Sequence, residues 1–179
     1  WIDRVAAPAM ARHLRTLSWP SDLATPDGGF MIVRESTHRS SLLSLHRATI
    51  GVRLPMLVSS LGRAWLSWCT EDERAVTLER LRQRDDAASR GARDAAAVRR
   101  LIDQTRRRGY AINLGEWTEE PSVVGIGCPV MSDGHAIGAV NLVLQRNLVS
   151  ERDLARRHAP MLQALADEIS AGVAALRAA

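Results

Sequence analysis

The residues best suited to hold a small molecule lie in two apolar segments, 122–131 and 136–144. In the first segment Gly125 and Gly127 share one face of an expected strand and leave a gap above it. The second segment is apolar apart from Asn141. A buried amide without partners costs about 1–3 kcal/mol, so Asn141 marks either a polar network or a ligand contact. A helix lying close over the glycines, with Asn141 bonded to the backbone, explains the same pattern equally well.

Two further groups are candidates for the walls of a pocket. Glu116 and Trp117 follow a short expected strand that contains Asn113, so an acid, an amide and an indole occur together. An isolated loop carboxylate that is simply solvated is the plainer explanation for Glu116. Ser59 and Ser60 begin an expected helix, where backbone N–H groups suit an anion such as a carboxylate. Serines at this position also serve commonly as helix caps alone.

Patterns for catalysis are absent from the sequence. No serine lies in a nucleophile elbow, and neither a dinucleotide-binding glycine motif nor a P-loop occurs. Cys69 and Cys128 form no disulfide or zinc pattern, so we expect buried, inert thiols in a reducing cytoplasm. His158 is expected to be a core histidine. We therefore expect no enzyme activity, no metal and no cofactor.

The elements that must position these residues are helices and strand pairs in alternation. The hydrophobic periodicity and capping signals predict helices over 2–17, from Val58 to Trp68, from Thr70 to about Arg84, up to a stop at Gly109, and from Ser150 onward. Strands are expected over 22–24, 30–34, 110–114, 122–131 and 136–144, with Asp133-Gly134 in the last turn. Residues 35–50 and 85–93 are expected to be connections. This order predicts a single α+β domain on an antiparallel sheet.

Composition and charge exclude several other classes. The chain has 179 residues, 46% of them hydrophobic and 25% charged, which excludes a disordered chain. No apolar run approaches the roughly 20 residues that cross a membrane, so no transmembrane segment is expected. All basic residues are arginines, and the pI near 10.3 suggests nucleic acid as a partner. However, acids interleave with the densest arginines, 74–108, which is typical of a solvated helix face rather than a DNA contact.

Several short motifs together resemble one family. They are Gly51-x-x-Leu54-Pro55, Ser59-x-Leu61-Gly62-Arg63-Ala64, Arg107-x-Gly109-Tyr110, Gly115-Glu116, and Cys128-Pro129-Val130 before the Asp-Gly hairpin. In this order and spacing they resemble the effector-binding domain of IclR-family transcription regulators, over nearly the whole chain. Residues 17–22 and 54–64 look most like activators of hydroxyphenylpropionate (aromatic acid) catabolism.

The resemblance implies an architecture and partners. It implies a GAF-like α+β fold over residues 1–179, with an antiparallel sheet of about six strands flanked by helices. It also implies a winged helix-turn-helix domain preceding Trp1, through which a homodimer or tetramer binds operator DNA in the cytoplasm. The chain itself is then a sensor of a small carboxylate effector, with no membrane partner.

The residues and the resemblance together predict an effector site. Ser59 and Ser60 are expected to bind a carboxylate, and Asn141 and Glu116 to bind polar ring substituents. Arg34 or Arg39 is a candidate counter-charge. The full expected set is Met56, Ser59, Ser60, Leu61, Glu116, Trp117, Gly125, Asn141 and Val143.

Two other classes of function stay open at this point. One is a GAF-like enzyme, for instance a reductase of small oxidised sulfur compounds, that uses Cys128 or Cys69. The other is a dimerisation module with a filled interior, which would leave no cavity over Gly125 and Gly127.

Overall fold

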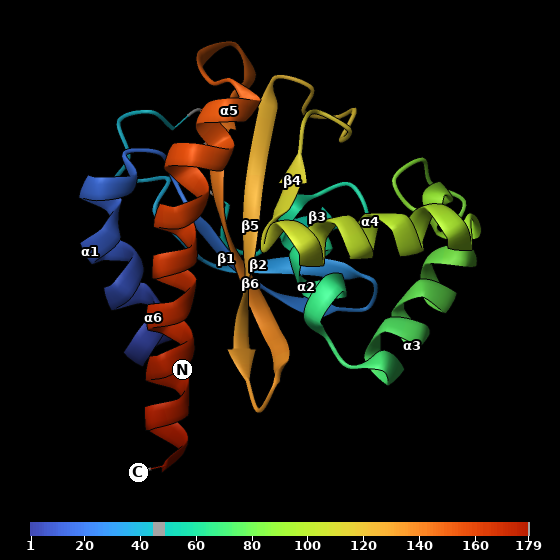
Figure 1. Cartoon of the computed structure of the whole chain (residues 1–179), viewed down its shortest axis with the longest axis horizontal. Helices are drawn as coiled ribbons and strands as arrows, with labels where there is room; N and C mark the ends of the chain where they lie inside the picture. The colour runs from blue at the N-terminus through green and yellow to red at the C-terminus, as the bar shows by residue number, and fades with distance from the viewer. Residues whose placement is uncertain (45–48, 179) are drawn as a thin grey trace.

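A computed structural model describes residues 1–44 and 49–178 and shows one six-stranded antiparallel sheet (Figure 1). Its strand order is β3-β2-β1-β6-β5-β4. The α+β class and the six-stranded sheet are therefore as predicted. The strands are β1 (Asp22–Asp27), β2 (Phe30–Ser36), β3 (Arg53–Pro55), β4 (Ala111–Asn113), β5 (Val123–Ser132) and β6 (His135–Gln145).

Helices cover both faces of the sheet. In Figure 1 the first and last helices lie together on one side, and α2, α3 and α4 lie on the other. None of the helices in the described part of the chain has the length and apolarity needed to cross a membrane. The helices are α1 (Ala7–Leu17), α2 (Ser60–Trp68), α3 (Glu71–Arg82), α4 (Ala95–Arg108), α5 (Glu151–Asp153) and α6 (Ala159–Ala178), with π-helical turns at Ile2–Ala6 and Leu154–His158 and 3₁₀ turns at Arg90–Arg93 and Arg146–Leu148.

Local sequence signals account for the ends of several helices. Thr70 and Glu73 form the expected capping box at the start of α3, with the Thr70 N–H donating to the Glu73 carboxylate at 2.9 Å. Gly109 ends α4 with a φ of +81°, a left-handed conformation that glycine adopts without strain. Ser150 caps the final helical segment as predicted. That segment passes through the π-helical turn before α6 begins.

The sheet divides the interior into two cores. On the α1 and α6 side, the alternating apolar residues of β5 and β6 pack as predicted. His158 is buried, at 4% exposed, between Leu154 and Ala159 of this core in the sequence, so the expectation of a core histidine is confirmed. A strict period of two along the segment 136–144 predicts Ile137 on the same face as Asn141, but Ile137 packs with the opposite core. The cause is a register shift between Val130 and Met131, which reverses the alternation locally.

Three short stretches differ from the expected boundaries. β3 was not predicted, since a three-residue strand is too short to show alternation. A polar connection such as 85–93 is normally exposed, yet Ala92 within it is fully buried. Asp86 accepts hydrogen bonds from both the backbone and the hydroxyl of Ser89, which folds this connection back onto the core. Within the expected loop 35–50, Thr37 and His38 are buried, and residues 45–48 lie outside the described part of the chain.

Candidate functional site

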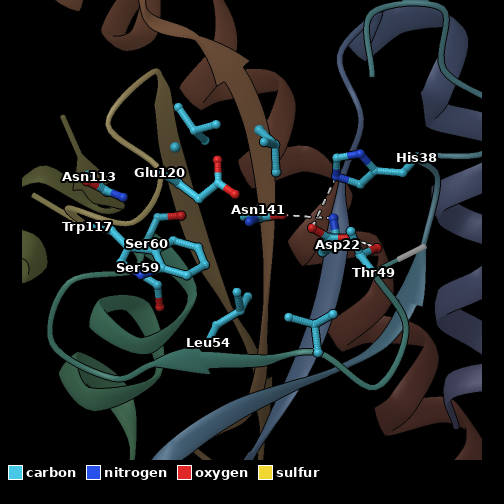
Figure 2. Close-up of a pocket in the computed structure, with 14 residues that line it drawn as sticks. Asp22, His38, Thr49, Leu54, Ser59, Ser60, Asn113, Trp117, Glu120 and Asn141 are labelled. Carbon is cyan, nitrogen blue, oxygen red and sulfur yellow. Dashed lines mark hydrogen bonds and ion pairs between the residues drawn. The ribbon is translucent and has the colours of Figure 1, made fainter. Parts of the chain in front are cut away.

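A cavity of about 250 Å³ lies between the sheet and the start of α2 (Figure 2). Pockets for drug-sized ligands run from about 300 to 1,000 Å³, so this volume suits a molecule of about one ring. Apolar and polar side chains both contribute to the walls. The cavity is lined by Asp22, His38, Thr49, Val52, Leu54, Ser59, Ser60, Asn113, Trp117, Glu120, Val123, Gly125, Asn141 and Val143.

One end of the cavity is formed by the N-terminus of α2. The Ser59 side chain caps the helix by accepting the N–H of Gly62 at 3.1 Å. The first N–H groups of any helix have no partner inside it, and they carry the positive end of the helix dipole. Because Ser59 and Ser60 both line the cavity, α2 presents this end to whatever the cavity holds. The arrangement can bind an anion without an arginine or lysine.

The two glycines of β5 allow α2 to lie this close to the sheet. A Cβ on Gly127 would lie 2.4 Å from the carbonyl oxygen of Ser60, and one on Gly125 would lie 2.8 Å from the Ser60 hydroxyl. Both distances are too short for real side-chain atoms, so neither position accepts a larger residue without movement. Gly125 also lines the cavity. The close helix and the gap above the strand therefore occur together rather than as alternatives.

Asn141 directs its amide nitrogen into the cavity. Its Oδ1 accepts the backbone N–H of Asp22 at 2.8 Å, and because an N–H can only donate, the atom facing it must be the oxygen. The NH₂ group consequently points the other way, toward the interior of the cavity (Figure 2). Asn141 is 6% exposed, so this donor lies in a largely dry environment. The backbone partner expected for Asn141 is present, and a free donor is left for a ligand.

A buried acid and a histidine form the other end of the cavity. Asp22 at the start of β1 is 4% exposed, and its Oδ2 lies 3.4 Å from Nε2 of His38. Thr49 lies 2.9 Å from Oδ1 of the same carboxylate. Sequence reasoning missed this group because residues 35–50 show no period. The one available signal was an acid directly before the apolar residues Leu23 and Ala24 of an expected strand.

Six of the nine expected site residues line the cavity and three do not. Met56 and Leu61 are almost completely buried in the core between α2 and the sheet. Arg34 and Arg39 are exposed and lie outside the cavity lining. The six that line it are Ser59, Ser60, Trp117, Gly125, Asn141 and Val143.

Glu116 is the third expected residue outside the cavity, since it pairs with Arg63 at 2.9 Å. The Arg63 side chain is 9% exposed and also donates to the backbone carbonyls of Leu57 at 2.7 Å and Ile112 at 2.5 Å. Burial raises the pKa of Glu116, but the Arg63 guanidinium and several hydrogen bonds outweigh it and hold this pKa below its ordinary value. Arg63 thereby joins α2, β4 and the loop that carries Trp117.

The two thiols lie away from the cavity in the dry interior. Cys69 and Cys128 are 4% and 1% exposed. Burial raises the pKa of Cys69 to about 11 and that of Cys128 to about 12. The thiolate is the reactive form, so neither thiol is activated for attack on a substrate. Among the described residues no three His, Cys, Asp or Glu side chains come together as metal ligands.

The buried thiols lead to a prediction about alkylation. At pH 8 the native protein is expected to react with iodoacetamide at least about tenfold more slowly than the urea-unfolded chain, because almost no thiolate is exposed. Mass spectrometry of quenched samples measures the rate at each cysteine. Rapid modification of one thiol in the native protein would contradict this and would favour an enzyme that uses it.

Comparison with known proteins decides the family. The profile of the family described as "Bacterial transcriptional regulator IclR C-terminal" matches residues 2–171. The chain belongs to the IclR family. The resemblance stated from the sequence motifs is thereby confirmed at the level of the family.

Solved structures of bacterial transcriptional regulators share this fold. An IclR-family transcriptional regulator from Brucella abortus has a TM-score of 0.77 and 24% identity, with 94% of this chain and 62% of that protein covered. The C-terminal domain of the Escherichia coli regulator KdgR has a TM-score of 0.73 and 23% identity, with 95% and 96% covered. An IclR homologue from Microbacterium hydrocarbonoxydans, complexed with 4-hydroxybenzoate, has a TM-score of 0.75 and 26% identity, with 99% and 69% covered.

Proposed function

We propose that this chain is the effector-sensing domain of an IclR-type transcriptional regulator and that its effector is a small aromatic carboxylate. The observation that carries the proposal is the cavity between the N-terminus of α2 and the amide of Asn141. It offers backbone N–H groups to a carboxylate at one end and a side-chain donor beside the ring. The Microbacterium homologue, 26% identical across 99% of this chain, was solved with a ligand of this class.

The apolar walls fit the ring of such a ligand. Trp117, Leu54 and Val143 contribute apolar surface to the cavity lining. A cavity of this size that is lined by both apolar and polar side chains binds a flat amphiphilic molecule better than a sugar or a nucleotide. The cavity also argues against a dimerisation module with a filled interior.

Regulation would follow from a population shift. An effector that binds one arrangement of α2 and the sheet more tightly than another favours that arrangement in proportion to the difference in affinity. In the proposal the homodimer or tetramer conveys this change to operator DNA through a separate winged helix-turn-helix domain in the cytoplasm. Hydroxyphenylpropionates are included among the effectors to test because residues 17–22 and 54–64 resemble their activators.

Titration calorimetry against hydroxylated benzoates and phenylpropionates tests the proposal, with acetate as an aliphatic control. We expect saturable binding of at least one aromatic acid and none of acetate at the same concentration. Asn141→Leu should weaken binding at least about tenfold, because it removes the donor in the cavity. Asn147→Leu, an exposed position after β6, is the matched control and should bind as the parent does.

Two results would contradict the proposal. The absence of both heat and thermal shift across the whole panel would remove the aromatic effector. Unchanged affinity in Asn141→Leu, with the variant folded by circular dichroism, would remove Asn141 from the site.

A further inference from the structure

The end of the cavity opposite α2 offers a hydrogen-bond acceptor, the carboxylate of Asp22. Figure 2 shows Asp22 and His38 on one side of the cavity and Ser59 and Ser60 on the other, with Asn141 between them. The Asp22 carboxylate is buried and lines the cavity. A carboxylate has about four lone-pair positions, so the two contacts to Thr49 and His38 leave acceptor capacity on the cavity side.

The orientation of this carboxylate follows from the hydroxyl groups around it. The hydroxyl of Thr49 lies 2.9 Å from Asp22 Oδ1 and 2.7 Å from the hydroxyl of Ser36. A carboxylate only accepts, so Thr49 donates to Asp22, and the Ser36 hydroxyl lies beside the same Thr49 oxygen. The Ser36 oxygen in turn accepts the backbone N–H of His38 at 3.2 Å. This chain of bonds holds Asp22 in place before any ligand arrives.

The charge around this end favours one kind of ligand group. Asp22 places a buried carboxylate in the lining at this end of the cavity. A second carboxylate on the ligand would face like charge in a dry environment, which disfavours it. An ether or a halogen would leave the acceptor unpaired. A hydroxyl satisfies the carboxylate and remains neutral.

We propose that Asp22, held by Thr49 and His38, selects effectors that carry a hydroxyl group on the ring opposite their carboxylate. The assignment rests on the proposed function, since it takes the effector carboxylate to lie at the N-terminus of α2. It adds a specificity-determining residue from β1. The effector class is then a hydroxylated ring acid rather than aromatic acids in general.

Four ligands that differ at one position test this on the unaltered protein. Calorimetry compares four acids that differ at the ring position opposite the carboxylate. This position carries a hydroxyl group in 4-hydroxybenzoate and a hydrogen in benzoate. It carries a methoxy group, which only accepts, in 4-methoxybenzoate and a second carboxylate in terephthalate. A hydrogen bond to a charged group predicts that 4-hydroxybenzoate binds about 10- to 100-fold more tightly than benzoate. The other two should bind more weakly still.

The variant Asp22→Asn assigns the preference to this residue. It keeps the shape of the side chain, so we expect the ratio of the affinities for 4-hydroxybenzoate and benzoate, both measured in this variant, to fall to within about threefold. Asp27→Asn, an exposed acid at the far end of β1, is the matched control and should keep the full preference. If Asp22→Asn fails to fold, the four-ligand series on the unaltered protein decides whether the cavity prefers a hydroxyl group.

The outcomes separate the two proposals. Equal affinity for all four acids overturns the role of Asp22 and leaves the effector site standing. A preference for the hydroxyl that survives in folded Asp22→Asn also overturns it. Binding of none of the aromatic acids overturns the proposed function, and the role of Asp22 falls with it.

Discussion

Replacing Gly127 by alanine is expected to destabilise the protein by about 3 kcal/mol, near the upper end of the usual range for overpacking a dense interior. The added Cβ would lie 2.4 Å from the carbonyl oxygen and 2.8 Å from the carbonyl carbon of Ser60. These are backbone atoms at the first turn of α2, so no side chain can rotate away to make room. Relief requires the whole helix to move off the sheet.

Urea unfolding followed by circular dichroism measures this loss. Gly91→Ala is the matched control, because its added Cβ would meet only the Leu57 side chain at 3.8 Å, an ordinary contact. The control should keep or slightly raise stability, since alanine restricts the unfolded chain. The displaced helix in Gly127→Ala should also weaken effector binding. A variant as stable as the parent would show that α2 does not lie against β5 in solution.

Arg63→Met is expected to cost about 3 kcal/mol, for a different reason. The side chain donates to the backbone carbonyls of Leu57 and Ile112, and its loss leaves both without this partner in a buried region. Each buried acceptor left unsatisfied costs about 1–3 kcal/mol. Methionine keeps most of the apolar length of the arginine side chain. The loss of stability therefore measures the hydrogen bonds of the guanidinium rather than a newly created cavity.

Glu116→Gln separates the ion pair from the backbone bonds. The Glu116 side chain is 47% exposed, and half-exposed pairs contribute less than about 1 kcal/mol. We therefore expect only a small change in the midpoint of urea unfolding for this variant. A loss as large as that of Arg63→Met would mean that the ion pair, and not the pair of carbonyls, is the important interaction.

The strands of the last hairpin could be predicted from the sequence because ten residues of alternation leave little ambiguity. The faces of β5, the glycine gap and the position of Asn141 all follow from that period of two. Ile137 was misplaced because a bulge shifts the register, and a bulge without a distinctive residue leaves no mark in the pattern.

The acceptor end of the cavity could not be predicted in the same way. Asp22 begins the short expected strand 22–24, but His38 lies in a segment with no period. The two meet because β1 pairs with β2, which places Asp22 opposite Ser36 and close to His38. Glu116 shows the opposite error. Proximity in sequence to Trp117 suggested a shared pocket, yet the buried Arg63 binds its carboxylate outside the cavity.

The hydrogen bond between Asn141 and the backbone of Asp22 gives the occupied cavity a built-in reporter. The amide proton of Asp22 is hydrogen-bonded to Asn141, the side chain expected to contact the ligand. Only residues 18–21 separate Asp22 from the end of α1. The carbonyl of Pro20 in that connection also accepts the N–H of Val143 at 2.9 Å, so β6 is bonded both to this connection and to the first residue of β1. A single nuclear resonance therefore senses both the state of the binding site and the end of the first helix.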